Sequence, residues 1–377
     1  MSTHPIAIIG AGLAGAATAW QLASRGHDVV ILERSVPASE WGSSHGSARI
    51  LRYTYPDPFY TRLMLEARRG WDQLEDLHGE RLITPTGSLD YGATRDPAAL
   101  AAVLADAGIS HELLTAAEAS ARWAGFAFDG PVLWHEDAGV IDAEETVKTM
   151  VGLAVAAGAE LRQDWAAARV LPHGEDYLVE SESGDTVVAS QVVVAAGGWL
   201  PALLGGLGLP QEALDALPTL EVRQEQALHF PYRDPETAWP TFINKRADIQ
   251  VYGLPGGRDA DFRGQKVAEY NGGRIIGSAL EHDRIVDPVR RERLVEYVAT
   301  ALPGLVPEPY AQTTCLFTNA PADEFIIDRV GGLTILSPCS GHGAKFAPLL
   351  GELTARLVTG ADSGVTRFRP LAALAGA

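Results

Sequence analysis

Apolar runs and glycines alternate at the start of the chain in a pattern typical of a strand, a helix and a second strand. Residues 6–9 form a short apolar run that stops at Gly10, which predicts a buried strand. The alanine-rich stretch 14–24 predicts a helix, and Gly26 fits the position that ends it. The apolar run 29–32 predicts the second strand. Together these elements make one βαβ unit.

Similar signals lie in the middle of the chain and near its end. Residues 191–197 read as a fully buried strand that ends in a tight turn, and residues 333–336 read as another buried strand. A C-terminal helix is expected to open at Lys345 and Phe346 and to run to about Leu357. The α/β signals are therefore spread over the whole chain.

The intervening stretches follow a different pattern. Runs such as 224–230 and 273–276 alternate with glycine and proline turns, which indicates a second, largely β region made by two insertions. We predict an α/β (α+β) fold class, with a Rossmann-type dinucleotide-binding domain and an inserted, mainly antiparallel-sheet substrate domain. The first domain is assigned residues 1–83, 140–219 and 318–377, and the second is assigned residues 84–139 and 220–317.

Composition excludes several classes of protein. A formal net charge of -18 and a pI near 4.9 argue against binding to nucleic acid or to an anionic membrane. We find no secretory signal and no apolar run long enough for a membrane span, so a cytoplasmic protein is expected. The two cysteines make no disulfide framework and show no zinc-finger spacing, and no metal is expected.

The turn between the first strand and the helix carries a phosphate-binding signature. It reads Gly-Ala-Gly-Leu-Ala-Gly from Gly10 to Gly15, and Glu33 closes the second strand. Gly10 permits the tight turn, Gly12 lets the backbone approach a pyrophosphate, and Gly15 lets the helix pack close to the strand. The pyrophosphate would lie at the positive end of the helix, and Glu33 would accept hydrogen bonds from ribose hydroxyls. The motif alone does not separate FAD from NAD, but its N-terminal position and the strand ending at residues 196–197 favour FAD.

Four further segments are more specific. Residues 42–52 read GSSHGSARILR, residues 314–318 TCLFT, residues 323–328 DEFIID and residues 340–346 SGHGAKF. With these segments the chain resembles the amine-oxidising flavoproteins typified by monomeric sarcosine oxidase and N-methyltryptophan oxidase. The resemblance covers essentially the whole chain. It implies an FAD-dependent oxidase that converts a secondary amine into an imine, and then an aldehyde plus an amine, with hydrogen peroxide as the other product.

The resemblance also implies how the flavin is held. Cys315 matches the cysteine that forms a thioether to a methyl group of the flavin ring, so FAD is expected to be covalently bound. His45 and Arg49 are expected to lie against one face of the ring, where a cation favours the anionic reduced form. A histidine can also be held there by hydrogen bonds alone. Cys339 lacks such a context and is expected to be simply buried.

Three cations take their expected roles from the same resemblance. Arg52 and Lys345 match the pair that binds a substrate carboxylate, in which arginine offers a bidentate fork and lysine a point charge. Lys266 matches the lysine that activates dioxygen, because a cation stabilises superoxide as it forms. Its surrounding loop is variable in the family, and a solvated surface lysine is the alternative there.

Two positions depart from the family pattern. Tyr270 stands where the family often has a substrate-side histidine, and Phe317 stands where it has a tyrosine. Both changes weaken the case for sarcosine itself and favour a bulkier N-alkyl or cyclic imino acid.

The expected residues fall into three groups. The expected catalytic residues are Lys266, Arg49, His45 and Tyr270, and the expected substrate-binding residues are Arg52, Lys345 and Phe317. The expected FAD-binding residues are Gly10, Gly12, Leu13, Ala14, Gly15, Glu33, Arg34, Ser43, Ser44, His45, Arg49, Val170, Ala196, Gly197, Trp199, Cys315, Gly341, His342, Gly343 and Lys345. The expected partners are a small-molecule amine and dioxygen, and the chain is expected to be a monomer.

Two other functions stay open at this point. One is an oxidase or dehydrogenase of a cyclic imino acid in a biosynthetic pathway, with either oxygen or a protein as electron acceptor. The other is a non-catalytic flavin-binding subunit of a larger complex. A plain NAD dehydrogenase fits less well, because it needs neither Cys315 nor the segment 42–52.

Overall fold

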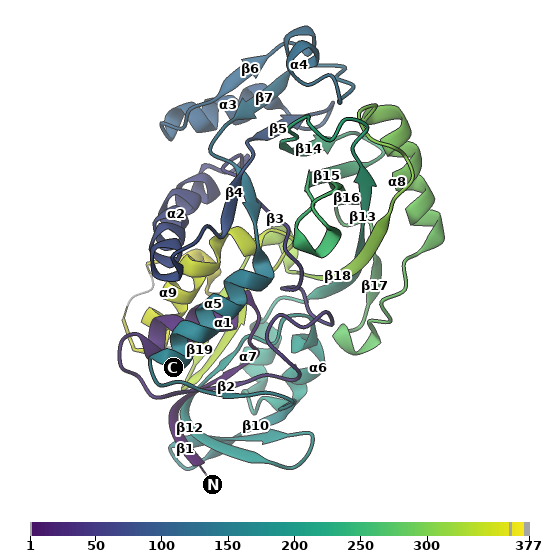
Figure 1. The fold of residues 1–377 in the computed structure, drawn as a ribbon. Helices are drawn as coiled ribbons and strands as arrows, with labels where there is room; N and C mark the ends of the chain where they lie inside the picture. Colours follow the sequence, from purple (N-terminus) through teal and green to yellow (C-terminus); the bar gives the residue numbers. More distant parts are fainter. Residues whose placement is uncertain (1, 362–363, 373–377) are drawn as a thin grey trace.

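The computed structural model describes residues 2–361 and 364–372, and the N-terminal βαβ unit lies at the centre of its first sheet (Figure 1). Strand β1 (Ser2–Ile9) pairs in parallel with β2 (Val29–Leu32) on one side and with β12 (Thr186–Val194) on the other. Two further strands are parallel to their neighbours: β9 (Glu160–Arg162) pairs with β2, and β20 (Leu333–Ser337) pairs with β12. Three more strands pair in an antiparallel way: β11 (Asp176–Ser181) with β12, β10 (Ala167–His173) with β11, and β19 (Ile326–Val330) with β20.

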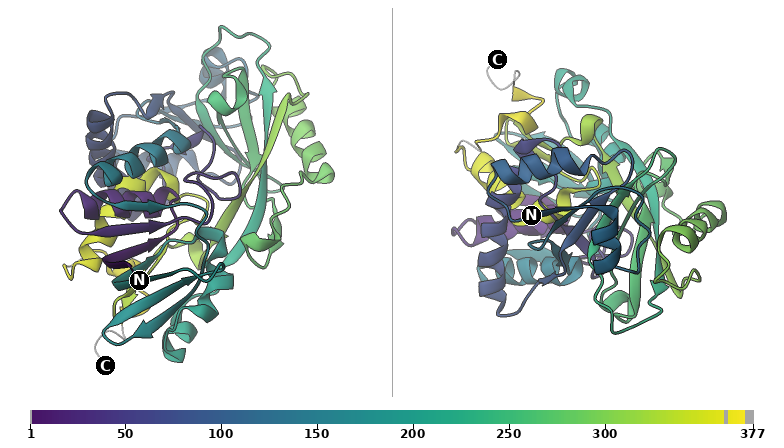
Figure 2. Two further views of the ribbon diagram at one scale, coloured as in Figure 1. Left: turned by 60° about the horizontal axis from the view of Figure 1, so that its bottom comes forward. Right: turned by 90° about the horizontal axis from the view of Figure 1, so that it is seen from above.

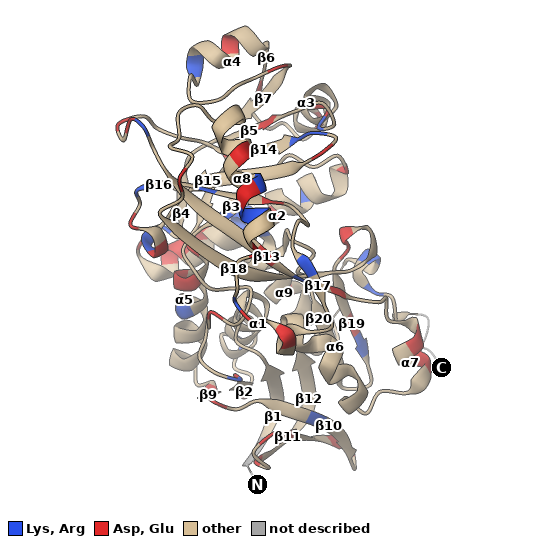
Figure 3. Cartoon of the chain, turned by 90° about the vertical axis from the view of Figure 1, so that its right-hand side faces the viewer, with Lys and Arg blue, Asp and Glu red and all other residues tan. Residues whose placement is uncertain are grey.

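The two faces of this sheet are buried against different partners. Ile6 and Ile8 of β1 pack into a cluster with helices α1 (Leu13–Ala23), α5 (Ala143–Ala156) and α9 (Ala347–Val358), whereas Ala7 and Ile9 face the opposite cluster. Strands β1, β2, β12 and β20 carry no Lys, Arg, Asp or Glu and are tan in Figure 3. A parallel sheet covered on both faces requires such apolar strands.

Helix α2 (Pro58–His78) packs beside α9. Asp57 caps its N-terminus by accepting a hydrogen bond from the Phe59 N–H at 2.9 Å, and Gly79 ends it with a φ of 83°. Within the described residues, we find no helix with both the length and the apolar composition to cross a membrane.

A second sheet stands beside the first, with helix α8 (Pro288–Ala301) packed on its face (Figure 2). Its strands are β5 (Ser88–Tyr91), β6 (Glu112–Leu114), β7 (Val132–His135), β13 (Glu221–Pro231), β14 (Thr241–Lys245), β15 (Gln250–Pro255), β16 (Gly264–Glu269), β17 (Arg274–Ile276) and β18 (Ala311–Asn319). All pairs in it are antiparallel except β5 with β14.

A third, smaller sheet is formed by three short strands. It consists of β3 (Arg49–Leu51), β8 (Gly139–Ile141) and β4 (Ile83–Pro85). The remaining α-helices are short: α3 (Pro97–Asp106), α4 (Ala116–Arg122), α6 (Leu200–Leu203) and α7 (Gln211–Ala216).

The predicted fold class is confirmed, and the element bounds differ in detail. Strand β2 has the predicted bounds, while β1 begins earlier and β12 is longer than predicted. The C-terminal helix opens with a 3₁₀ turn at Gly343–Phe346 before α9, because Pro348 lacks the N–H of a helix interior and suits a first turn. The assignment of two domains stays a prediction, and residues 1, 362–363 and 373–377 of its ranges lie outside the described residues.

Candidate active site

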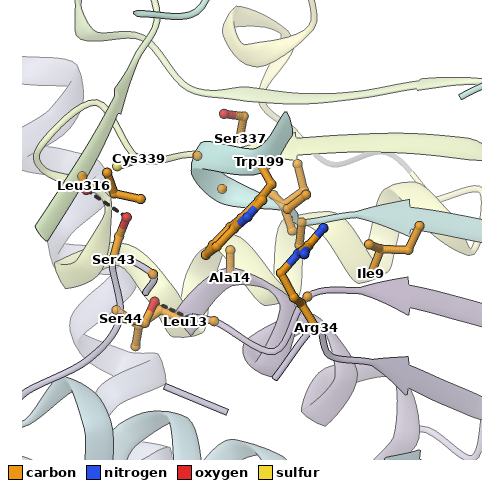
Figure 4. Close-up of a pocket in the computed structure, with 18 of the residues that line it drawn as sticks. Ile9, Leu13, Ala14, Arg34, Ser43, Ser44, Trp199, Leu316, Ser337 and Cys339 are labelled. Carbon is orange, nitrogen blue, oxygen red and sulfur yellow. Dashed lines mark hydrogen bonds between the residues drawn. The ribbon is translucent and has the colours of Figure 1, made fainter. Parts of the chain in front are cut away.

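A cavity of about 400 Å³ opens where the parallel strands of the first sheet end (Figure 4). Ile9 of β1, Leu32 of β2 and Leu336 of β20 line it from the carboxyl ends of their strands, and Ala195 lines it just beyond β12. In α/β folds ligands bind in the crevice at this edge of the sheet. The predicted fingerprint therefore borders a cavity at the expected place.

The glycines of the fingerprint are required by close contacts. A Cβ on Gly15 would lie 1.9 Å from the carbonyl oxygen of Gly10, so no side chain fits between helix and strand. Gly10 has a φ of 98°, which favours glycine. Ser44 accepts a hydrogen bond at 3.0 Å from the Leu13 N–H at the start of α1, as Figure 4 shows. A Cβ on Gly12 would meet the same hydroxyl oxygen at 3.0 Å, a tight contact that glycine avoids.

Glu33 is fixed at the end of β2 by the backbone. Its two carboxylate oxygens accept hydrogen bonds from the Ala11 N–H at 2.7 Å and the Ser35 N–H at 3.0 Å. Burial raises the pKa of this carboxyl group, and the two backbone hydrogen bonds act against that rise. The side chain lines the cavity, where it can accept further hydrogen bonds from a ribose.

One end of the cavity is closed by a cation and an aromatic ring. The Arg34 guanidinium lies 5.8 Å from the centre of the Trp199 ring and forms an ion pair with Glu182 (Figure 4). All three side chains line the cavity. Trp199 belongs to the 3₁₀ turn Gly197–Trp199 that follows β12.

The loop 43–49 forms the other end and is held on strand β18. Ser43 donates a hydrogen bond from its hydroxyl to the Leu316 carbonyl at 2.7 Å. Arg49 donates to the carbonyls of Ser43, Ala48 and His45, each at 2.9 Å. This guanidinium is therefore fixed by backbone bonds and lines the cavity without a carboxylate partner among the described residues.

The two cysteines lie on either side of this end. Cys339 lines the cavity, and its sulfur accepts a hydrogen bond from the Thr318 N–H at 3.3 Å. Cys315 is not among the lining residues, but it lies on the same face of β18 as Phe317, which does line the cavity. Burial raises the pKa of the Cys315 thiol, and the charges of Arg49 and Lys266 act to lower it.

Lys266 lies in β16, directly opposite His229 of β13, and is 6% exposed. Its ammonium group is 3.5 Å from the Ala48 carbonyl. Burial, followed by the nearby Arg49 charge, lowers the pKa of Lys266 to about 8, while Asp259 acts to raise it. The lysine is therefore buried and close to a carboxylate, so the solvated surface alternative does not describe it.

Asp259 is held in place by the loop that carries His45. Its carboxylate accepts a hydrogen bond from the Ser47 hydroxyl, and its own N–H donates back to that oxygen at 3.0 Å. Burial lowers the pKa of His45 to about 3 and that of His229 to about 4, so both imidazoles are neutral at pH 7. His45 Nε2 and His229 Nδ1 are buried and have no hydrogen-bond partner among the described residues.

A second cavity, of about 1350 Å³, reaches this cluster from another side. His45, His229 and Asp259 line it together with Trp41 and Thr314. The residues around Lys266, namely His45, His229 and Asp259, thus line the second cavity and not the first.

Arg52 and Lys345 are brought together around one tyrosine although their positions are far apart in sequence. The Arg52 guanidinium lies 4.8 Å and the Lys345 ammonium 5.7 Å from the centre of the Tyr55 ring. Lys345 is 5% exposed and donates to the His342 carbonyl at 2.8 Å. Burial, with the Arg52 charge as a smaller cause, holds the pKa of Lys345 well below its usual range.

Tyr270 lies beside Phe317, which lines the first cavity. Their rings lie 6.0 Å apart, and a Cβ on Gly341 would meet both of them at under 3 Å. The Tyr270 hydroxyl donates to Asp323 at 3.0 Å. The two positions that depart from the family pattern are thus neighbours in space.

The expected FAD-binding residues divide into those that line the first cavity and those that do not. The lining residues are Gly10, Gly12, Leu13, Ala14, Glu33, Arg34, Ser43, Ser44, Arg49, Ala196, Gly197, Trp199, Gly341, His342 and Gly343. The residues outside the lining are Gly15, His45, Val170, Cys315 and Lys345. Val170 is fully buried in the core of the first sheet, where its side chain packs on Val179 and Val187.

Sequence reasoning missed the residues that surround the expected cations. Asp259 and His229 are absent from every motif, and so is Asp323's neighbour in space, Lys245, while Ser47 lies within the segment 42–52 but was given no role. Cys339 could have been found, because it directly precedes the SGHGAKF segment that lines the cavity.

Comparisons with known proteins agree with this arrangement. The family described as FAD dependent oxidoreductase matches residues 5–357. Monomeric sarcosine oxidase of Streptomyces avermitilis is 31% identical over 374 residues, which cover 94% of this chain and 93% of that enzyme. N-methyl-L-tryptophan oxidase of Escherichia coli is 28% identical and covers 97% of this chain and 98% of its own. The open form of NikD, an unusual amino acid oxidase essential for nikkomycin biosynthesis, superposes with a TM-score of 0.83 at 26% identity, over 95% of this chain and 94% of that one.

Proposed function

This chain belongs to the FAD-dependent oxidoreductase family, and from that premise we propose that it oxidises a secondary amine, an N-methyl or other N-alkyl amino acid. The products are an imine, which hydrolyses to an aldehyde and an amine, and hydrogen peroxide. FAD, when bound, accepts a hydride equivalent from the carbon beside the amine nitrogen and returns both electrons to dioxygen.

The observation that carries the amino-acid part of the proposal is the placement of Arg52 and Lys345. Both cations lie against the Tyr55 ring, and neither has an ion-pair partner among the described residues. Lys345 is buried and Arg52 is half-buried. A cation removed from water without a partner is costly, and a bound carboxylate would supply the missing charge. A simple amine offers no such group.

The residues around the first cavity suit FAD. The N-terminus of α1 at Gly12 and the Glu33 carboxylate, which both border the cavity, match a pyrophosphate followed by a ribose. We propose that the flavin ring lies at the other end of the cavity, beside Arg49, and that Cys315 is linked to it. The shared face of Cys315 and Phe317 supports that link.

The histidines beside the site carry no positive charge. Burial holds the pKa of both His45 and His342 at about 3, so neither imidazole carries a positive charge at pH 7. The amine therefore meets no histidine acid that would protonate it. Lys266 supplies the cation beside which dioxygen is reduced, in keeping with its buried ammonium group.

A second candidate is the oxidation of a cyclic imino acid. It is favoured by the aromatic pair Tyr270 and Phe317, whose two rings lie beside the site. The similarity to NikD, an unusual amino acid oxidase essential for nikkomycin biosynthesis, supports a role in a biosynthetic pathway.

The deciding experiment is anaerobic reduction of the flavin by a panel of candidate substrates. N-methyl amino acids should bleach the flavin absorption, whereas the matching amines without a carboxylate should not. Bleaching by cyclic imino acids alone would favour the second candidate. Failure of every amino acid to bleach bound flavin would contradict both and leave a non-catalytic subunit.

The covalent link has its own test. Cys315→Ser should release FAD into the supernatant when the protein is precipitated with acid, while the matched variant Cys339→Ser should retain it. Release of FAD from the unchanged protein would show that there is no link.

A further inference from the structure

Lys245 is a third cation beside the proposed substrate site that no motif singled out. It is the last residue of β14, and its ammonium group lies 5.8 Å from the centre of the Tyr270 ring. Tyr270 in turn contacts Phe317, which lines the first cavity. Lys245 is half-buried and has no ion-pair partner among the described residues.

The backbone positions this lysine firmly. Its carbonyl accepts a hydrogen bond from the Thr94 N–H at 3.0 Å, and its strand pairs with β5 and β15. A Cβ on Gly92 would lie 2.5 Å from that carbonyl, so the turn after β5 presses directly against Lys245. The same turn carries Arg95.

Arg95 differs from Lys245 because its charge is already neutralised. It forms a buried ion pair with Asp90 at 2.6 Å, with both side chains almost fully enclosed. The other oxygen of Asp90 accepts a hydrogen bond from the Thr54 hydroxyl at 2.7 Å. The Thr54 carbonyl accepts from both Arg95 and Arg52. Asp90 is thus already bonded to Arg95 and Thr54, and it forms no ion pair with Lys245.

Asp323 is another carboxylate whose charge acts on Lys245. It lies beyond ion-pair distance and accepts its hydrogen bond from Tyr270. Burial raises the pKa of Asp323 and lowers the pKa of Lys245, so burial favours neither charge. His135 and His342 add no positive charge at pH 7, because burial lowers the pKa of these histidines to about 4 and about 3.

The group of charged side chains around Tyr55 and Tyr270 thus contains more cations than carboxylates. Its cations are Arg52, Arg95, Lys245 and Lys345, and its carboxylates are Asp90 and Asp323. Even with both carboxylates ionised, two positive charges are left without a partner. An amino acid with a neutral amine brings one negative charge, from its carboxylate, and leaves the other cation uncompensated.

The sequence adds an independent observation. Only four of the 30 Lys and Arg residues in the chain are lysine, at positions 148, 245, 266 and 345. Lys148 is exposed and paired with Glu144, whereas the other three lie around the proposed site. In a chain that uses arginine for its surface, the compact ammonium group occurs mainly where a ligand or dioxygen is expected.

We propose that the substrate carries a second acidic group besides its α-carboxylate and that Lys245 binds this group. The proposal rests on the proposed function, because Arg52 and Lys345 are taken to hold the α-carboxylate. The substrate class is then an N-alkyl amino acid with two carboxylates. The second carboxylate lies either on the side chain or on the N-substituent.

The first test measures binding without turnover, in the flavin-loaded protein. Glutarate and butanoate have chains of similar length, and both should perturb the flavin absorption when they bind. Glutarate should bind at least tenfold more tightly than butanoate, since a charged hydrogen bond has that effect. In Lys245→Met the two affinities should converge, and Lys245→Arg should keep most of the preference.

The matched control is Arg246→Met. This change removes one positive charge at the next residue, whose guanidinium lies on the Tyr297 ring instead. The preference for glutarate should survive it. Equal binding of glutarate and butanoate by the unchanged protein, or an unchanged preference in Lys245→Met, would overturn the proposal.

The second test separates this proposal from the proposed function and locates the second acid. Anaerobic bleaching is compared for N-methylglutamate, N-(carboxymethyl)alanine and N-methylalanine. Faster bleaching by N-methylglutamate places the additional carboxylate on the side chain. Faster bleaching by N-(carboxymethyl)alanine places it on the N-substituent. Bleaching by N-methylalanine at an equal or higher rate than both overturns the role of Lys245 and leaves the proposed function intact. If none of them bleaches the flavin, the proposed function fails, while the acid-binding test still decides whether Lys245 binds an anion.

Discussion

The two regions that hold the buried lysines differ in how their charges are balanced. Lys266 has the Asp259 carboxylate nearby and faces two neutral histidines, His45 and His229. The Lys345 ammonium group donates to the His342 carbonyl and lies over the Tyr55 and Phe346 rings, and the cation next to it is Arg52. The Arg49 charge also acts on Lys266, so the first region has one carboxylate for two cations, whereas the second has two cations and no carboxylate within ion-pair distance among the described residues.

This difference separates two uses of a buried cation. An unbalanced group of cations binds a ligand that is already charged, because the ligand supplies what the protein lacks. A cation that already has a carboxylate nearby gains little from a permanent anion, but it can stabilise charge that develops during a reaction. We therefore propose that the Arg52 region binds the carboxylate and that the Lys266 region reacts with dioxygen, and four substitutions test that proposal.

The largest effect is expected from Lys266→Met. Reoxidation of the reduced flavin by dioxygen should slow by about 10²–10³-fold, the usual cost of removing one group that stabilises developing charge. Anaerobic reduction by substrate should be almost unaffected, because Lys266 lies outside the carboxylate region. Stopped-flow absorption measures both steps, and Lys148→Met is the matched exposed control. Equal slowing of both steps would break the distinction between the regions.

A smaller effect is expected from Arg52→Ala and from Lys345→Ala. Each should raise the KM for carboxylated substrates by roughly tenfold or more, since a charged hydrogen bond is worth about 1.5–3 kcal/mol. Reoxidation by dioxygen should keep its rate. Steady-state kinetics with varied substrate and varied oxygen distinguish these outcomes, and an unchanged KM would mean that the carboxylate binds elsewhere.

The smallest effect is expected from Asp259→Asn, and it concerns pH. The pKa of Lys266 is about 8, and Asp259 acts to raise it. If the ammonium form is the one that reacts, reoxidation is fast below that pKa and is lost as pH rises through it. Removing the carboxylate lowers the pKa, so the loss should begin at lower pH in the variant. A profile of reoxidation rate against pH that does not move would show that Asp259 does not influence Lys266.

Local features of the site could be predicted from the sequence, and the comparisons confirm the family that those features indicated. Gly10, Gly12 and Gly15 are recognisable because their spacing lies within one short stretch of chain, although only Gly15 has its closest contact, with Gly10, inside that stretch. The neighbours of the cations could not be found in the same way. A hydrogen bond from Ser47 positions Asp259 near Lys266, and the pairing of β14 with β5 positions Lys245 at the site. Such long-range pairings leave no periodic signal in the chain.

The first cavity has a consequence for how the protein is made. Its walls come from segments that begin at Ile9 and continue, through residues 32–44, 195–203 and 316–317, to Leu350 in helix α9. A nascent chain that has emerged only as far as the fingerprint has the pyrophosphate turn but none of the wall formed by residues 336–350. Stable capture of FAD must therefore follow synthesis of nearly the whole chain. Retention of FAD would then show whether helix α9 has packed against helix α1.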